Sequence, residues 1–480
     1  MHPFPFLRIL LTLCASAALL HSAEVWQVDE TADWQGTSAA SEGVAIADGL
    51  VAPTGATGVY RSHLQTFPEK VAAKSITLEQ SPVWLNWQPV DKVLPPDLGD
   101  APVFLSIGPG NYWAFGLKAG DSGGYHAWQS KDMKNWQHHG MVTPRRAKWT
   151  TTAEYVDGKF YIYYDFPNDQ DPHVYIDDDL FDGKPGKDMG MAFKDPSDGS
   201  DCAVIRSLDG KFHLIYEDWS PIDASKHSWD SPLAGHAVSE DGLSDFTILP
   251  PAVDERTGPT GVFKEFPHPH WHKDDPENYP AKIAPADIPE HRIKAGQKRA
   301  FARYEVHEPE QDAFGDWAAI SIGGQYYLFG DYHPAGKKGW NSMSVAWFTA
   351  SDINQPFSFC GHIGQGHPDP DIGFAEGQFY LFTQTRNDFV SPGPWVERVE
   401  ARVGVDTEGD GRIDHWSAWQ EVKERYDHIP GFAKQIAREP AAMDLSELPA
   451  GYGFAFELQL TDTTGNDSKP LIDKVRLEFE

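Results

Sequence analysis

The chain is poor in basic residues relative to acidic ones. Its 480 residues include 40 Lys and Arg against 71 Asp and Glu, which gives a formal net charge of −31. A nucleic-acid-binding protein needs a basic surface, because displacing counterions from the phosphates supplies much of its affinity. Anionic membrane surfaces likewise attract basic segments. We therefore expect neither nucleic acid nor a membrane among the partners of this protein.

Cysteine is also scarce, with three residues in the whole chain, Cys14, Cys202 and Cys360. No pair of them has the close spacing of a metal-binding motif, which excludes a cysteine-based metal site. Cys202 and Cys360 each lie in an apolar, strand-like run. A disulfide in an oxidising compartment and two buried free thiols are both compatible with that context.

The first 23 residues are typical of a secretory signal peptide. Arg8 supplies the positive charge, an apolar stretch follows over residues 9–20, and Ala23 offers a small residue before a cleavage point. The apolar run is well short of the roughly 20 residues that a membrane-spanning helix needs. We expect residues 1–23 to be removed and the mature protein to be exported, either to the periplasm or out of the cell.

Long helical periodicity is missing, and short β-hairpin patterns take its place. Five segments align by eye, each with a two-residue turn that usually contains Gly and then an alternating aromatic and aliphatic strand. They are IGPGNYWAFG at 107–116, VDGKFYIYYD at 156–165, LDGKFHLIYED at 208–218, IGGQYYLFGD at 322–331 and AEGQFYLFTQ at 375–384.

An acidic residue marks the strand before each of these turns. These residues are Asp100, Glu154, Asp201, Asp316 and Asp369, at intervals of 54, 47, 115 and 53 residues. A hairpin repeat of about 50 residues indicates propeller blades, and the long interval indicates an insertion at about 219–312. We predict an all-β chain with a five-bladed propeller over 91–394, in which these acids meet at one mouth. Two or three of them are expected only to cap strands or turns.

The flanks of the propeller carry further strands. Residues 58–80, 396–420 and 451–480 alternate in the way of half-buried strands. Isolated hairpins are only marginally stable, so neither flank can form a core alone. We expect residues 24–90 and 395–480 to combine into one accessory β-sandwich. The alternative is two separate extensions on the propeller surface.

The segment DTEGDGRID at 406–414 resembles the first half of a calcium-binding loop. Asp406, Glu408, Asp410 and Asp414 would offer the oxygen ligands, around a Gly at the tight turn. Ser417 stands where an EF-hand has its bidentate Glu, so the segment is not an EF-hand. It is either a structural calcium site or a solvated acidic turn, and no cofactor is expected to be needed for chemistry.

Aromatic residues are abundant, with 17 Trp, 17 Tyr and 27 Phe. Aromatic rings stack on sugar rings, and carboxylates activate water and stabilise oxocarbenium-like transition states, so carboxylates and aromatics around a mouth suit an oligosaccharide substrate. His307 and Glu308 are adjacent, just before the fourth blade, and can supply a proton donor and a carboxylate beside it. A lone His-Glu pair is weak evidence for a catalytic site. The additional acids Asp100 and Asp254 strengthen this interpretation.

Four further residues are candidates for binding the sugar. Gln170 and His173 lie in the polar turn NDQDPH after the strand of the second hairpin, which either lines the mouth or forms a rigid loop. Trp149 precedes the second blade, and Asp201 heads the third.

The segments that contain these residues resemble glycoside hydrolase family 117. The resemblance covers the chain from about residue 80 to its end and includes WTTTAEYVDGKFYIYYDFPNDQDPHVYIDDDL, PPAVDERTGPTGV and GHPDPDIGFAEGQFYLFTQ. It implies a five-bladed propeller that removes 3,6-anhydro-L-galactose from the non-reducing end of agar oligosaccharides, with inversion. On the matching positions it implies Asp100 as general base, Asp254 as a second essential acid, and His307 with Glu308 as the proton-donating pair.

Two features bear on partners and substrate. The family dimerises through an N-terminal S-x-A-x-x-R motif, which residues 24–57 lack, so a homodimer stays an open alternative. The acidity of the chain disfavours a sulfated galactan unless Arg145, Arg146 and Lys148 form a local basic patch. A five-bladed glycosidase acting on another α-linked or sulfated galactan, an arabinan or a xylan is the second interpretation. A non-catalytic carbohydrate-binding propeller is the third.

Overall fold

The computed structural model describes most of the chain after residue 23. The described residues are 24–80, 84, 87–99, 101–121, 124–143, 149–165, 171–195, 201–218, 230–254, 257, 312–337, 340–394, 398–462 and 469–480. They contain one short α-helix, α1 (Thr31–Thr37), and otherwise β-strands joined by turns. No helix among them is long and apolar enough to cross a membrane.

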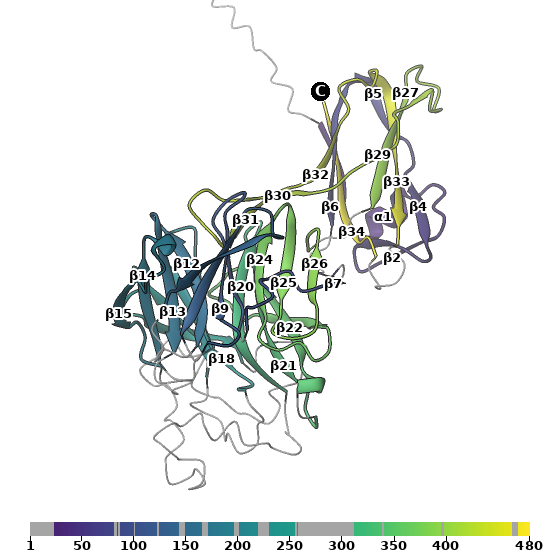
Figure 1. Ribbon diagram of the computed structural model, residues 1–480. Helices are drawn as coiled ribbons and strands as arrows, with labels where there is room; N and C mark the ends of the chain where they lie inside the picture. The colour runs from purple at the N-terminus through teal and green to yellow at the C-terminus, as the bar shows by residue number, and fades with distance from the viewer. Residues whose placement is uncertain are drawn as a thin grey trace, which may run out of the picture.

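Five antiparallel sheets follow one another along the chain, as the hairpin repeats predict (Figure 1). From inner to outer strand, the first sheet contains β8 (Val103–Ser106), β9 (Tyr112–Leu117), β10 (Tyr125–Ser130) and β11 (Trp136–Met141). In the same order, the second contains β12 (Thr150–Val156), β13 (Lys159–Asp165), β14 (Pro172–Asp177) and β15 (Lys187–Met191), and the third contains β16 (Ala203–Arg206), β17 (Phe212–Glu217), β18 (Ala234–Ser239) and β19 (Thr247–Val253). The fourth contains β20 (Ala313–Ile322), β21 (Gln325–His333), β22 (Ser344–Ala350) and β23 (Ser358–Ile363). The fifth sheet contains β24 (Asp371–Ala375), β25 (Gln378–Phe382), β26 (Asp388–Ser391) and, at its outer edge, β7 (Gln88–Val90).

The tight turns between the first two strands of the blades explain why the repeat is visible in the sequence. A type I′ turn needs positive φ at both central residues, which Asp and Gly tolerate better than other residues. Asp157 and Gly158 have φ of 49° and 82°, and Glu376 and Gly377 have 49° and 73°. The local sequence therefore specifies the hairpin from which each of these blades is built.

The five inner strands close into a ring. β8, β12, β16, β20 and β24 each contact the next in this order, and β24 lies against β8. At this closure the backbone N–H of Phe104 donates to Asp371 Oδ2 at 2.5 Å. The pairing of the strands thus confirms the predicted all-β fold, and the contacts between the inner strands follow the order of a five-bladed propeller.

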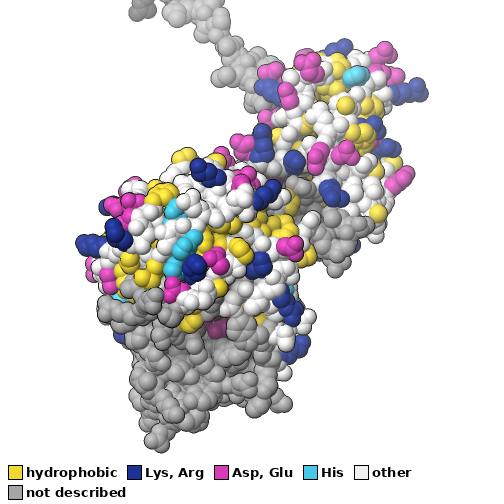
Figure 2. All heavy atoms as spheres, in the orientation of Figure 1, with side chains coloured by type: hydrophobic (Ala, Val, Ile, Leu, Met, Phe, Trp, Pro, Cys, Tyr) yellow, Lys and Arg dark blue, Asp and Glu magenta, His cyan; other side chains and the backbone are white. Residues whose placement is uncertain are grey.

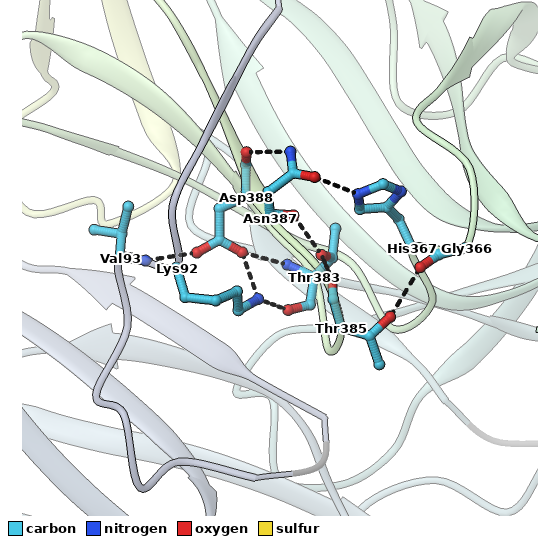
Figure 3. Close-up of polar contacts among 8 residues, drawn as sticks. All are labelled: Lys92, Val93, Gly366, His367, Thr383, Thr385, Asn387 and Asp388. Carbon is cyan, nitrogen blue, oxygen red and sulfur yellow. Dashed lines mark hydrogen bonds and ion pairs between the residues drawn. The ribbon is translucent and has the colours of Figure 1, made fainter. Parts of the chain in front are cut away.

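A polar network fastens β7 into the fifth blade (Figure 3). The buried carboxylate of Asp388 accepts from the ammonium of Lys92 at 2.6 Å, from the N–H of Val93 at 2.8 Å and from the N–H of Thr383 at 3.1 Å. Residues from both ends of the propeller sequence therefore share one blade. Because β7 belongs to the propeller, the predicted boundary at residue 90 is too late by this strand.

The two flanks form one β-sandwich, as expected. One sheet contains β1 (Glu24–Val28), β2 (Val44–Ala47), β3 (Leu50–Pro53), β6 (Ala73–Gln80), β32 (Ala441–Asp444) and β34 (Ile472–Phe479). The other contains β4 (Thr57–Arg61), β5 (Gln65–Val71), β27 (Val399–Asp406), β28 (His415–Trp416), β29 (Gln420–Glu421) and β33 (Gly451–Thr461). Their inner faces enclose one apolar core to which both flanks contribute. Acidic and basic side chains are interspersed over the visible face of both units (Figure 2).

Two strands of the C-terminal flank leave the sandwich and join the propeller. β30 (Arg425–His428) and β31 (Gln435–Glu439) pair with each other, and β31 pairs in parallel with β20. The predicted C-terminal flank at 395–480 is therefore not purely sandwich. The pattern of alternating residues could not reveal this, because it specifies a strand but not the partner of the strand.

The insertion in the third blade is shorter than predicted. Residues 230–254 supply β18 and β19, the outer two strands of that blade, so they do not belong to the interval 219–312. Residues 258–311 of that interval lie outside the described residues. Cys202 is buried and Cys360 is exposed, and both thiols are free.

Candidate active site

The strand pairing defines a mouth at one end of the ring. Asp201, Asp316 and Asp369 occupy the same position in blades three, four and five, two residues before Ala203, Ala318 and Asp371, which pair with equivalent residues of the second strands. All three acids have positive φ, between 47° and 53°. Asp tolerates this conformation because its short side chain can bond locally. In Figure 1 this end of the propeller points away from the sandwich.

The counterparts in the first two blades are not acids. In blade one the equivalent residue is Ala101, which has the same positive φ of 47°, and in blade two it is Thr150. Asp100 is therefore the neighbour of the repeat position rather than its counterpart. Asp100 itself lies outside the described residues, as do Gln170, His307 and Glu308.

Buried acids and one His converge at this mouth. The ligand atoms of Asp230, Asp331 and His333 lie within 4.8 Å of one another, and so do those of Asp316, Asp331 and Asp369. His333 Nε2 is 2.5 Å from Asp230 Oδ2, and the N–H of Asp369 donates to Asp331 Oδ1 at 2.7 Å. Within the described part of the chain these are the groups whose oxygen and nitrogen donors could hold a divalent cation.

The mouth strongly disfavours having all its carboxylates ionised. Burial raises the pKa of Asp316 well above its usual range, and the charges of Asp201, Asp369 and Asp331 raise it further. Burial likewise raises the pKa of Asp331, as do the charges of Asp369 and Asp230. A carboxyl whose pKa is raised by burial and by neighbouring charges is suited to general acid–base chemistry.

Gly315 lets the side chains of Glu217 and Asp230 lie close to the inner strand β20. The position that a Cβ would take at Gly315 lies 2.2 Å from Glu217 Oε1 and 2.7 Å from Asp230 Oδ1. Both side chains are buried, so the glycine creates the space into which they point. A side chain at residue 315 would push one or both of them aside.

Asp254 lies at the mouth end of blade three. It follows β19, the outermost strand, and is fully buried. Its backbone N–H donates to Thr257 Oγ1 at 3.1 Å, and its carbonyl oxygen accepts from the N–H of Thr257 at 2.9 Å, which forms a tight turn. The structure thus places Asp254 and Asp201 at the same end of one blade, on its outermost and innermost strands.

The other described candidates for binding the sugar lie at the same end of blade two. Trp149 is half-buried before β12, and its carbonyl oxygen accepts from the N–H of Asp165 at 3.0 Å. His173 begins the third strand, where its ring lies 5.4 Å from that of Tyr164 and its Nδ1 lies 2.9 Å from the carbonyl oxygen of Asp171. Since His173 is two strands out, it lies roughly 10 Å farther from the axis than the inner strand.

The prediction that Glu154 heads the second blade is wrong. Glu154 lies in the middle of β12, fully buried, and accepts from the N–H of Arg206 on the neighbouring inner strand at 3.3 Å. The reason is a bulge at Thr151 and an earlier start of the strand, which carry Glu154 down the channel wall.

The sequence analysis missed a second acidic position in the repeat. Asp165, Glu217 and Asp331 each stand five residues after the aromatic that follows the hairpin turn, at the mouth end of the second strand. All three are buried. The signal was present in the aligned segments YIYYD, LIYED and YLFGD, whose last residues include these acids.

The predicted calcium loop is held by its own backbone. Asp406 Oδ1 accepts from the N–H of Gly409 at 2.6 Å and its Oδ2 from that of Gly411 at 2.8 Å, while Asp414 Oδ2 accepts from the N–H of Thr407 at 2.7 Å. Glu408 and Asp410 are exposed. These four acids do not form one of the convergent groups found among the described residues. The calcium site stays a prediction.

No family model and no curated protein matches the chain. Similar solved structures include an exo-1,5-α-L-arabinanase from a bovine ruminal metagenomic library, with 16% identity, coverage of 63% of this chain and 94% of that one, and a TM-score of 0.36. An endo-arabinase from Bacteroides thetaiotaomicron has 8% identity, coverage of 63% and 96%, and a TM-score of 0.40. A thermostable family-43 glycoside hydrolase has 12% identity, coverage of 73% and 98%, and a TM-score of 0.36. At values this low, the fold rests on the strand pairing described above.

Proposed function

We propose that the protein is an exported glycoside hydrolase that removes 3,6-anhydro-L-galactose from the non-reducing end of agar-derived oligosaccharides by hydrolysing the α-1,3 bond with inversion. The observation that carries the hydrolytic part of this proposal is the convergence of carboxyls at one mouth of the propeller, two of which have a raised pKa. The sugar itself comes from the resemblance to glycoside hydrolase family 117. No cofactor is needed for this chemistry, and the partner is the oligosaccharide.

The roles of the residues follow from the requirements of inversion. The general base and general acid must stand about 6.5–9.5 Å apart, so that a water fits between the base and the anomeric carbon. Asp100 takes the proton of that water, and His307 gives a proton to the departing galactose oxygen. Glu308 or Asp254 keeps the imidazole charged or binds sugar hydroxyls. Any mouth carboxyl that is ionised would add negative charge, which favours an oxocarbenium-like transition state.

Incubation of the mature chain with neoagarobiose tests the proposal directly. Chromatography follows the released sugars, and proton NMR identifies the first-formed anomer of 3,6-anhydro-L-galactose. We expect both monosaccharides and an inverted first product. Retention of the anomeric configuration, or no release by a folded protein, would refute the proposed reaction.

Variants test whether turnover depends on residues of the mouth rather than on acidic residues elsewhere on the surface. We expect Asp100→Ala and Asp254→Asn to lower turnover by roughly 10²-fold or more, as loss of acid–base groups does. Asp352→Asn is the matched control, because Asp352 caps an exposed turn after β22 at the opposite end of blade four. Full activity of Asp100→Ala would exclude it as the base. Release of sugar only from arabinosides, xylosides or sulfated galactans would keep the enzyme class and change the substrate, and binding without release would indicate a carbohydrate-binding propeller.

A further inference from the structure

The end of the channel opposite the mouth is crossed by the hairpin of β30 and β31. β31 pairs with Ser321 and Ile322 on the free, inner edge of β20, so it lies on the channel side of the innermost strand. On β30, Tyr426 and His428 pack against Phe374 of blade five, with ring centroids 6.4 Å and 5.4 Å away. The segment that links the propeller with the sandwich therefore contacts the inner strands of two neighbouring blades, at the end of the propeller nearer the sandwich (Figure 1).

One side chain of this hairpin runs up the channel. Lys434, just before β31, is 6% exposed, and its carbonyl oxygen accepts from the N–H of Ser321 at the far end. Its ammonium donates to Thr152 Oγ1 at 2.8 Å and to the carbonyl oxygen of Val204 at 2.7 Å. These acceptors belong to blades two and three, whereas the backbone of Lys434 is bound to blade four.

The level that the ammonium reaches lies close to the mouth. Thr152 pairs with Tyr163 in blade two at the position that Asp371 holds in blade five, two residues along the inner strand from the mouth position. At about 3.3 Å per residue, this places Thr152 roughly 7 Å below the level of Asp369. A positive charge thus stands directly beneath the acids of the mouth.

The walls of the channel at this level are acidic. Burial raises the pKa of both Glu154 and Asp371, and Lys434 is the foremost cation that opposes this rise. Arg206 also acts on Glu154, but its guanidinium is directed outward, against Phe432 and the carbonyl oxygen of Gly431. A buried carboxylate without a cationic neighbour would be strongly disfavoured. The ammonium therefore stabilises the ionised form of the acids in the channel wall.

We propose that Lys434 is a positioning residue of the active site: inserted from the segment that joins propeller and sandwich, its ammonium is the resident counter-ion of the channel and holds β12 and β16 in the arrangement that the mouth acids need. Its catalytic consequence rests on the proposed function, whereas its role as counter-ion does not. Lys434 touches no substrate and acts through the strands that it bridges.

Chemical replacement of the ammonium tests the counter-ion role without any activity assay. Lys434→Ala in the full chain removes the part of the side chain that corresponds to propylammonium. We expect its Tm to fall by roughly 5–10 °C, and to recover by at least half in propylammonium chloride. Methylammonium should restore less, and tetramethylammonium or sodium chloride at equal ionic strength nothing. Equal recovery in all four salts, or none, would overturn the inference.

Kinetics test the positioning role. In Lys434→Met the apolar stem of the side chain is largely kept, while the charge and the two hydrogen bonds of the ammonium are lost. This variant therefore serves even where the alanine variant folds poorly. We expect kcat to fall by about tenfold or more with KM changed less than threefold, as displacement of catalytic groups does, and propylammonium to restore kcat in the alanine variant. Lys211→Met is the control, because Lys211 forms an exposed ion pair with Glu240 at 3.3 Å.

The outcomes separate the two proposals. A lower Tm with unchanged kcat would overturn the positioning role and leave Lys434 as a structural pin. An inactive wild-type protein whose alanine variant still recovers its Tm in propylammonium would refute the proposed function and support the counter-ion. An active wild-type protein whose alanine variant does not recover its Tm in propylammonium would support the proposed function and refute the counter-ion role.

Discussion

Asp331→Asn should make the protein more stable at neutral pH and less active. Asp331 is buried with carboxylate oxygens of Asp316 and Asp369 within 4.8 Å, and the charges of Asp369 and Asp230 add to the effect of burial in raising its pKa. Two unit charges at that separation repel by about 3.5 kcal/mol at an effective dielectric constant near 20. Because a proton taken up by the cluster relieves part of this repulsion, we expect a gain of about 1–2 kcal/mol from the substitution. The asparagine keeps an acceptor for the N–H of Asp369.

The pH dependence gives the sharper test. A carboxyl whose pKa is raised by folding binds its proton more tightly in the folded than in the unfolded chain. Its contribution to stability is therefore fully present below the ordinary pKa of Asp, near 3.9, and is lost as the pH rises through the raised value. The advantage of Asp331→Asn should be small near pH 4 and grow toward pH 7.5.

Thermal unfolding followed by near-UV circular dichroism, in EDTA between pH 4 and 8, measures this difference. For a propeller of this size the expected gain corresponds to a Tm increase of about 2–4 °C at pH 7.5. Asp444→Asn is the control, because Asp444 is exposed and Ser446 lowers its pKa, so no gain is expected there. A variant less stable than wild type at pH 7.5, or a gain that does not shrink toward pH 4, would refute the charge argument.

Three further substitutions test other parts of the structure. Asp388→Ala should cost about 3 kcal/mol, because it removes the buried acceptor that fastens β7 into blade five; an unchanged urea midpoint would contradict this role. His213 Nδ1 lies 2.9 Å from His236 Nε2 between two buried rings, and burial lowers the pKa of these groups to about 4 and about 3. Stability should therefore fall as the pH drops below about 6.5, and His236→Gln should weaken that dependence, which denaturation at pH 4.5 and 7.5 measures. Gly315→Ala should lower kcat by about tenfold or more, since its methyl would displace the carboxylate of Glu217; normal kinetics would show that the mouth can adapt.

The parts of the fold that local sequence determines were predictable. The turn at Asp157 and Gly158 needs two residues with positive φ, and such turns repeat often enough to reveal the blades. The sandwich was also predictable, because strands that alternate at both ends of a chain must bury their apolar faces somewhere. In each case a short-range requirement is written into neighbouring residues.

The parts that depend on distant pairing were not predictable. β31 pairs with β20 through only two residues, Gln435 and Ile436, across more than a hundred positions. Nothing near Lys434 indicates that its ammonium enters the channel. The mouth was predicted in outline, because Asp201 and Asp316 head neighbouring blades and the charge of Asp201 acts on Asp316. A one-residue shift in blade one and a bulge at Thr151 broke the simple repeat.

The composition of the sandwich has a consequence for how the protein is made. Among the described strands, β4, which ends at Arg61, pairs with β33, and β6, which ends at Gln80, pairs with β32 and β34, all of which begin after Val399. At about 5–20 residues per second, a ribosome needs roughly 15–65 s to make the intervening chain. During that time β4 and β6 have apolar faces and lack these partner strands. Their protection from aggregation must come from a chaperone, or from export that delays folding until the last strands have arrived.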